Sequence, residues 1–151
     1  MRAPPPGWSR INASIFYDDA AAAIDFLCDA FGFERVMVIE GEGGRVEHSE
    51  LRLGDNGLVM VGSAGGGSHR EGGLPAVSPR AVNGQNTSML CVFVDDADAH
   101  AARAEAAGAT IADRPTTHDY GEDHWADRTY RAVDPEGHHW WFMQRVRGPG
   151  S

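Results

Sequence analysis

Hydrophobic and polar residues alternate along this chain with two periods, and each change of period marks the boundary between a strand and a helix. Residues 11–17 alternate with period two, as a strand does, and residues 20–31 are alanine-rich with apolar residues at helical spacing. Asp18 or Asp19 is placed to cap the start of this helix, and Gly32 to end it. The apolar stripe predicted to face the core consists of Ala23, Phe26, Leu27 and Ala30.

Three short strands are predicted after this helix, and a long segment without periodicity follows them. The strands cover residues 33–39, 45–53 and 58–61, and the last two are joined by the turn sequence Asp55-Asn56-Gly57. Residues 62–86 are rich in Gly, Ser and Pro, which fits a linker between two modules, a mobile lid, or both.

The second half of the chain repeats the order of the first half. Phe16-Tyr17-Asp18-Asp19-Ala20 corresponds to Phe93-Val94-Asp95-Asp96-Ala97, and self-similarity of this kind indicates a duplicated structural unit. A strand at 87–94 precedes a helix at 97–107 that Gly108 ends, and strands are predicted at 110–112, 128–133 and 138–144. The predicted fold class is α+β, with βαβββ modules at residues 10–61 and 87–146 and the segment 62–86 between them, in one compact domain.

The last predicted strand is dense in aromatic residues and follows the turn sequence Asp134-Pro135-Glu136-Gly137. Alternation assigns its residues to two faces, and both faces are too apolar to be left in water. We expect His138, Trp140 and Phe142 to pack beneath the second helix. The other face carries His139, Trp141 and Met143.

Composition and charge limit the classes of partner. The formal net charge is -9, with 22 acidic against 13 basic residues, which argues against nucleic acid and anionic membranes as partners. No apolar run approaches the roughly 20 residues that span a bilayer. The first residues lack the apolar segment of a signal peptide, and Cys28 and Cys91 are expected to be buried reduced thiols, so a cytoplasmic location is expected.

The tandem modules, the helix entries and the closing Asp-Pro-x-Gly-His-x-Trp-x-Phe strand resemble the vicinal oxygen chelate superfamily over roughly residues 10 to 146. This superfamily includes glyoxalase I, bleomycin-resistance proteins, fosfomycin-resistance enzymes and extradiol dioxygenases, and the chain resembles the bleomycin-resistance branch. The resemblance implies that the sheet of each module curls into half of a barrel, with a cavity inside and a helix outside. It also implies a homodimer.

In metal-using relatives, the first and last strands of each module each supply one ligand. The matching positions here are Asn12, Met60, Met89 and Trp141, and three of these four side chains have no oxygen or imidazole donor for a hard metal. We therefore expect no cofactor and no metal site, and a divalent metal is the alternative.

Alternation along the strands places further residues on the same faces as Asn12, Met60, Met89 and Trp141. A cavity lined by these residues would be apolar and rich in aromatic residues and methionine, as ligand sites often are. The alternative is that these residues only fill a small barrel. His139 is a weak candidate for an acid or base, and Cys91 could act as a nucleophile, although an inert buried thiol is the simpler interpretation. The predicted ligand-binding residues are Asn12, Ser14, Phe16, Met60, Met89, Cys91, Phe93, Trp125, His139, Trp141 and Met143.

The segment 117–128 gathers His, Asp, Glu, Tyr and Trp residues ahead of a strand. Trp125 is predicted to be a stacking lid over the cavity, with His118 or His124 as a polar contact. An exposed acidic loop and a metal site on His118, Asp119, Asp123 and His124 are the alternatives. His48, His69 and His100 are expected at the surface.

The function expected from the sequence is therefore the binding of a small hydrophobic or aromatic molecule in a metal-free cavity, for sequestration or resistance. The alternatives are a metal-dependent lyase, dioxygenase or transferase of the same superfamily, and a metal-free enzyme that uses His139 or Cys91.

Overall fold

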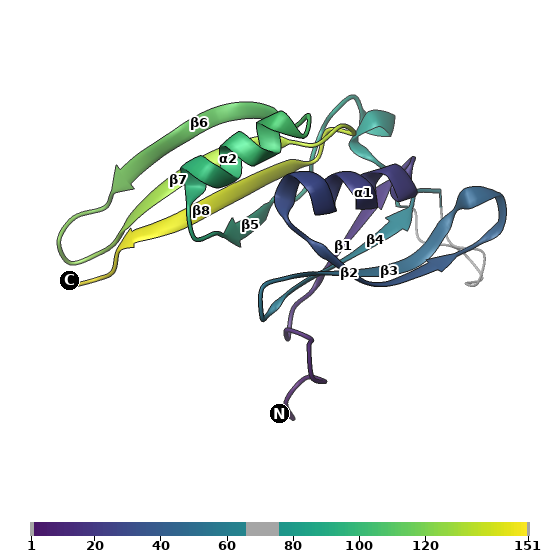
Figure 1. Cartoon of the computed structure of the whole chain (residues 1–151), viewed down its shortest axis with the longest axis horizontal. Helices are drawn as coiled ribbons and strands as arrows, with labels where there is room; N and C mark the ends of the chain where they lie inside the picture. The colour runs from purple at the N-terminus through teal and green to yellow at the C-terminus, as the bar shows by residue number, and fades with distance from the viewer. Residues whose placement is uncertain (1, 66–75, 151) are drawn as a thin grey trace. The chain divides into compact units, whose positions relative to one another are not determined.

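The computed structural model describes residues 2–65 and 76–150, so His69 and the middle of the predicted 62–86 segment lie outside the described residues. The described residues form two α-helices and eight strands, arranged as two open four-stranded mixed sheets (Figure 1). The chain divides into two compact units between Asn83 and Gly84. No helix in the described part of the chain has the length and apolar character to cross a membrane.

The first unit contains β1 (Ala13–Tyr17), α1 (Ala20–Phe31), β2 (Glu34–Glu40), β3 (Val46–Leu53) and β4 (Gly57–Ser63). Its strand order is β1-β4-β3-β2, with β1 parallel to β4 and the other neighbours antiparallel. Helix α1 packs on one face of this sheet. The core between them is formed by Ile15, Tyr17, Ala23, Ile24, Leu27, Phe31, Leu51, Val59 and Val61.

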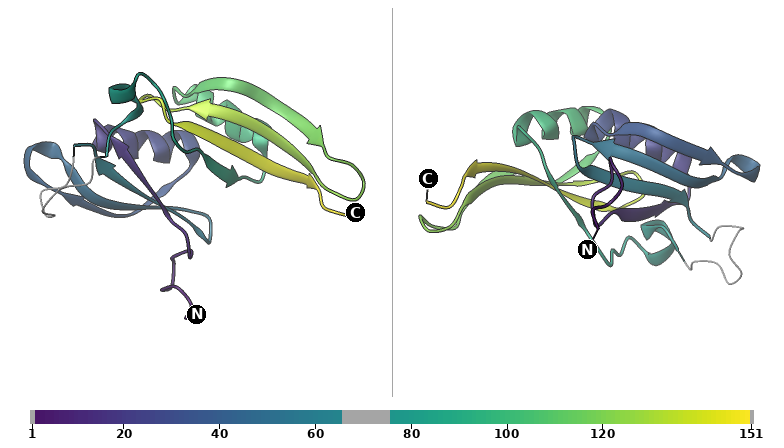
Figure 2. Two further views of the ribbon diagram at one scale, coloured as in Figure 1. Left: turned by 180° about the vertical axis from the view of Figure 1, so that it is seen from behind. Right: turned by 90° about the horizontal axis from the view of Figure 1, so that it is seen from below.

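The second unit contains β5 (Leu90–Phe93), α2 (Ala97–Ala106), β6 (Thr110–Asp119), β7 (Ala126–Val133) and β8 (His139–Arg147). Its order, β5-β8-β7-β6, repeats the first unit, again with the outer first strand parallel to the last. Helix α2 lies in front of this sheet in Figure 1, and the strands lie in front of it when the molecule is seen from behind in Figure 2. The predicted pair of βαβββ modules is confirmed.

The two helices begin and end where the sequence predicts. Asp19 accepts a hydrogen bond from the Ala22 amide at 3.0 Å, and Asp96 accepts one from the Ala99 amide at 2.9 Å. Both carboxylates satisfy amides that would otherwise lack a partner in the first helical turn. Gly32 follows α1 with φ of 80°, a left-handed conformation that glycine adopts without strain.

Several predicted boundaries are wrong in detail. Strand β1 begins at Ala13, and Ile11 is 89% exposed, because Asn12 turns back to bond Ser9. In α1 Phe26 is only half-buried, and the buried stripe instead uses Ile24 and Phe31. Within the predicted loop, residues Pro79–Val82 form a short 3-10 helix that begins with proline, a residue that fits the first helical turn.

Strand β6 is much longer than predicted, and it changes the interpretation of the segment 117–128. It runs from Thr110 to Asp119 and pairs along its length with β7, through two register shifts. The ends of the segment are therefore strand, and only residues 120–125 form the loop of the hairpin. The alternative of an exposed acidic loop is therefore wrong for His118 and Asp119, because both residues lie on β6.

Strands β3 and β4 are joined at one end by backbone pairs and at the other by serine side chains. The ladder pairs Leu51–Leu53 with Gly57–Val59. Beyond it, the buried Ser49 hydroxyl donates to the Val61 carbonyl at 2.7 Å and accepts from the Val61 amide at 3.0 Å. The Ser49 hydroxyl thus replaces two ladder hydrogen bonds.

Replacing Ser49 by alanine is expected to lower the free energy of unfolding by about 2 kcal/mol, because it leaves a buried amide and a buried carbonyl without partners. Urea denaturation measures the change. Ser14→Ala, at an exposed position of β1, is the matched control and should change stability by less than about 0.5 kcal/mol. Equal effects of the two substitutions would contradict a role for the Ser49 hydroxyl in joining the strands.

Candidate functional site

The face of the second sheet that α2 does not cover carries five of the eleven predicted ligand-binding residues. Cys91 of β5 lies opposite Trp141 of β8, and Phe93 opposite Met143. On the other face, Phe142 lies 4.4 Å from the His100 ring of α2, and the Ala97 amide of α2 bonds the Gln144 side chain. Alternation therefore places Cys91, Phe93, His139, Trp141 and Met143 together on what we call the helix-free face.

The helix-free face is much more exposed than the face under α2. Trp140 and Phe142 are fully buried, whereas Phe93 is 59% exposed and Met89, which lies just before β5, is 43% exposed. Trp141 and Met143 are half-buried. Cys91 is exposed, so the expectation of a buried thiol is wrong, and Cys28 is only half-buried. Sequence periodicity assigns a residue to a face but does not say how completely that face is covered.

Two arginines lie on the helix-free face, each in an ion pair. Arg131 of β7 lies opposite Trp141, and its Nε bonds Asp113 at 2.7 Å. Arg145 of β8 lies opposite Asp127, and its Nε bonds that carboxylate at 2.5 Å. Strand geometry separates the two arginines by roughly 13 Å along the sheet, since they lie four residues apart in register.

The predicted lid residue Trp125 contacts this face through Arg145. The Arg145 guanidinium lies 5.4 Å from the centre of the Trp125 ring and 5.5 Å from that of Phe93, which is cation–π distance on both sides. Tyr120 lies 5.6 Å from Trp125 across the hairpin loop. The loop therefore adds aromatic surface to one end of the helix-free face.

A pocket of about 410 Å³ lies at the other end, and we call it the Arg131 pocket. Asn86 holds its wall, because its amide nitrogen donates to the carbonyls of Gly84 and Gly137 and its oxygen accepts from the His139 amide. The lining residues are Gly84, Asn86, Thr87, Ser88, Met89, Arg131 and His139. Two predicted residues, Met89 and His139, thus meet in a pocket with polar residues that the sequence did not single out.

The predicted residues of the first unit lie on the corresponding face of its own sheet. Ser14 pairs with Met60, and Phe16 with Gly62, in the phase in which Cys91 pairs with Trp141. Asn12 precedes β1, and its side chain is engaged with Ser9, accepting from the hydroxyl at 2.8 Å and donating to the carbonyl at 2.7 Å. These bonds compete with any ligand for the Asn12 amide.

The acidic and imidazole side chains of the described residues do not converge on a common point. Within residues 2–65 and 76–150, no group of three or more His, Cys, Asp or Glu side chains is arranged to hold a metal ion. His48 contacts Glu50 at 3.2 Å on a partly exposed surface, and His138 contacts Asp134 at 3.2 Å. Asp119 and Arg147 form an ion pair.

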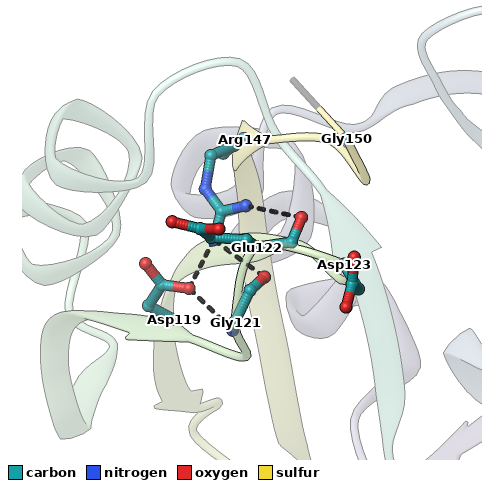
Figure 3. Close-up of a pocket in the computed structure, with 6 residues that line it drawn as sticks. All are labelled: Asp119, Gly121, Glu122, Asp123, Arg147 and Gly150. Atoms are coloured by element: carbon teal, nitrogen blue, oxygen red, sulfur yellow. Dashed lines mark hydrogen bonds and ion pairs between the residues drawn. The ribbon is translucent and has the colours of Figure 1, made fainter.

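A larger pocket of about 790 Å³ lies at the β6–β7 loop (Figure 3). Its one cation, Arg147, is already bonded to Asp119 and to the Gly121 and Glu122 carbonyls, as the dashed lines in Figure 3 show. A hydrogen bond from the Gly121 amide and the nearby Arg147 lower the pKa of Asp119. Its arginine is already engaged and its lining residues include no apolar side chain, so we assign the ligand site to the helix-free face.

The prediction that His100 lies at the surface is wrong, because its side chain is half-buried between α2 and the sheet. Its Nδ1 lies 2.5 Å from the Tyr130 hydroxyl, and its ring packs on Phe142 beneath α2. Burial raises the pKa of Tyr130, because ionisation would place a charge inside the core. The pair is 30 residues apart in sequence, and no local pattern signals it. It fixes α2 on the sheet and does not reach the helix-free face.

Comparison with known proteins places this chain among related sequences and folds. The family model described as glyoxalase/bleomycin resistance protein/dioxygenase superfamily matches residues 10–142. Uncharacterized proteins of Mycobacterium bovis and Mycobacterium tuberculosis are each 31% identical over 137 residues, which is 91% of this chain and 84% and 75% of theirs.

Solved structures with the same fold include TioX from Micromonospora sp. ML1, with a TM-score of 0.67 and 28% identity over 91% of this chain and 99% of that one. TnmS3 from Streptomyces sp. CB03234, described as an antibiotic binding protein, has a TM-score of 0.62 and 19% identity over 97% of this chain and 99% of its own.

Proposed function

The chain belongs to the glyoxalase/bleomycin resistance protein/dioxygenase superfamily, and we propose that it binds a small hydrophobic or aromatic molecule at a metal-free site, as a sequestration or resistance protein would. The site comprises the helix-free face of the second sheet.

The observation that carries this proposal is the exposure of large apolar side chains on a sheet face whose opposite side carries the fully buried Trp140 and Phe142. Phe93 and Met89 are 59% and 43% exposed, and Trp141 and Met143 lie beside them, half-buried. Burial of apolar surface contributes roughly 25 cal/mol per Å², so a flat ligand that covers these side chains gains most of its affinity from them. TnmS3, which shares the fold, is an antibiotic binding protein, and this supports the same class of ligand here.

The donors on the helix-free face also favour binding over catalysis. Arg131 and Arg145 are held in ion pairs. A nucleophilic Cys91 would need a neighbouring base, and the residue opposite it is Trp141. The side chains of this face therefore suit shape and stacking recognition.

Titration of ¹⁵N-labelled protein with neutral 2-naphthamide, in the presence and absence of EDTA, tests the proposal. We expect saturable shifts at the Trp141 indole and at neighbouring amides of β5 and β8, with the same affinity in both conditions. Metal analysis of the purified protein accompanies the titration. Absence of binding, or stoichiometric Fe, Mn, Ni or Zn whose removal abolishes binding, would contradict a metal-free binding site and favour the metal-dependent enzyme.

A further inference from the structure

The Arg131 pocket presents hydrogen-bond donors beside an apolar surface, and this combination defines a narrower ligand class than aromatic molecules in general. The inference rests on the proposed function, because it concerns the polar end of the same ligand. Arg131 lies opposite Trp141 on the helix-free face, so a group bound in the pocket is adjacent to the aromatic part of the site.

Arg131 has unused donor capacity. Asp113 accepts from its Nε at 2.7 Å, and His139 Nδ1 lies 3.4 Å from its Nη1. Within the described residues, no acceptor bonds Nη2, and the side chain is 32% exposed. A guanidinium carries five N–H groups, so the edge formed by its two Nη atoms remains able to bind a planar acceptor after Asp113 has taken the Nε–H.

His139 supplies a second donor, its Nε2, as a consequence of its contact with Arg131. The guanidinium has only donors, so His139 Nδ1 is the acceptor in this pair. A neutral imidazole that accepts at Nδ1 carries its proton on Nε2, which makes Nε2 a donor. Thr87 and Ser88 contribute hydroxyl groups, which also donate.

The pocket lining contains no carboxylate. The acidic partner of Arg131, Asp113, lies directly opposite it on the neighbouring strand β6 and accepts from its Nε. The Nη donors that Asp113 leaves available favour a ligand group with two acceptor oxygens. The net charge of -9 repels anions at long range, but salt screens this repulsion beyond about 8 Å at physiological ionic strength. Contacts within the pocket are therefore expected to decide the preference.

We propose that the Arg131 pocket selects aromatic ligands that carry a carboxylate, with the ring system over Trp141 and Met89 and the carboxylate against the Nη edge of Arg131. Hydrogen bonds between two charged groups are stronger than those to a neutral amide, and the guanidinium fork matches a carboxylate in shape. The ligand class is therefore a planar aromatic acid.

The paired probes 2-naphthoate and 2-naphthamide test the proposal, since they share a ring system and differ in charge and in the second oxygen. NMR titration is expected to give a Kd for 2-naphthoate about tenfold or more below that for 2-naphthamide. In Arg131→Gln the two Kd values should fall within about twofold of each other, by loss of 2-naphthoate affinity alone. Arg131→Lys keeps the charge without the fork and should retain part of the preference.

Arg114→Gln is the matched control, because Arg114 is an exposed arginine that pairs with Glu105 outside the pocket. The preference should be unchanged in this variant. Equal affinities of the two probes for the unmodified protein, with shifts at Trp141, would overturn the inference and leave the proposed function standing. A preference that persists in Arg131→Gln would also overturn it. Failure of both probes to bind would count against the proposed function itself.

Discussion

Replacement of Asp134 by alanine is expected to lower the free energy of unfolding by about 3 kcal/mol or more. The Asp134 side chain is completely buried. Its Oδ1 accepts from the Glu136 and His138 amides, both at 3.0 Å, and its Oδ2 accepts from the Trp140 Nε1 at 3.2 Å. Alanine would leave two backbone donors and an indole donor without this acceptor in the interior, at the point where the turn enters β8.

Asp134→Asn separates the two parts of this effect. The amide oxygen can still accept from the two backbone amides, but the amide nitrogen would face the Trp140 donor. The free energy of unfolding of Asp134→Asn should lie between that of the wild-type chain and that of Asp134→Ala. Urea denaturation followed by tryptophan fluorescence measures all three. Asp123→Ala, an exposed loop substitution, is the control and should change stability by less than about 0.5 kcal/mol. A loss below about 1 kcal/mol in Asp134→Ala would contradict this role for the carboxylate.

The features predicted correctly from the sequence are those that short segments encode. The helix caps Asp19, Asp96 and Gly32 bond to residues within one helical turn in the sequence. The turn at Asp134–Gly137 likewise depends on four consecutive residues. The duplication of the modules is also visible, because it repeats such local signals. Two sheets with the same strand order follow from it.

The features predicted wrongly depend on residues far apart in the chain. Strand β6 extends to Asp119 because β7 pairs with it, and Thr110–Asp119 has no clear alternation of its own. His100 is half-buried because Tyr130 offers it a hydroxyl from the sheet. Cys91 is exposed because α2 lies on the other side of β5.

The candidate site shows the same division. Alternation along β8 separates Trp140 and Phe142 from Trp141 and Met143, and the structure places these pairs on opposite faces. Nothing in the sequence indicates that Arg131 lies opposite Trp141, because that pairing depends on the register between β7 and β8. His139 is predicted from the sequence, but Arg131 is not, and no signal from single residues indicates its place in the site.

Trp141→Ala is expected to raise the Kd for neutral 2-naphthamide by about 10- to 100-fold, because stacking and apolar burial against an indole contribute roughly 1–3 kcal/mol. Trp141 lies in register between Cys91 on one side and Arg131 on the other, so its ring is central to the helix-free face. The neutral probe keeps this result independent of any preference for a carboxylate.

Two further variants decide whether the indole acts through contact with the ligand or through the packing of β8. Trp141→Phe retains an aromatic face and should recover most of the affinity. If the indole acted only through the packing of β8, both variants would instead lose affinity in proportion to their loss of stability.

Trp8→Ala removes an indole from the N-terminal segment, before β1, and should leave the Kd unchanged. Since Trp141 is only half-buried without ligand, its removal should cost less stability than affinity. An unchanged Kd in Trp141→Ala would exclude the helix-free face as the binding surface, because Trp141 is the largest side chain on it.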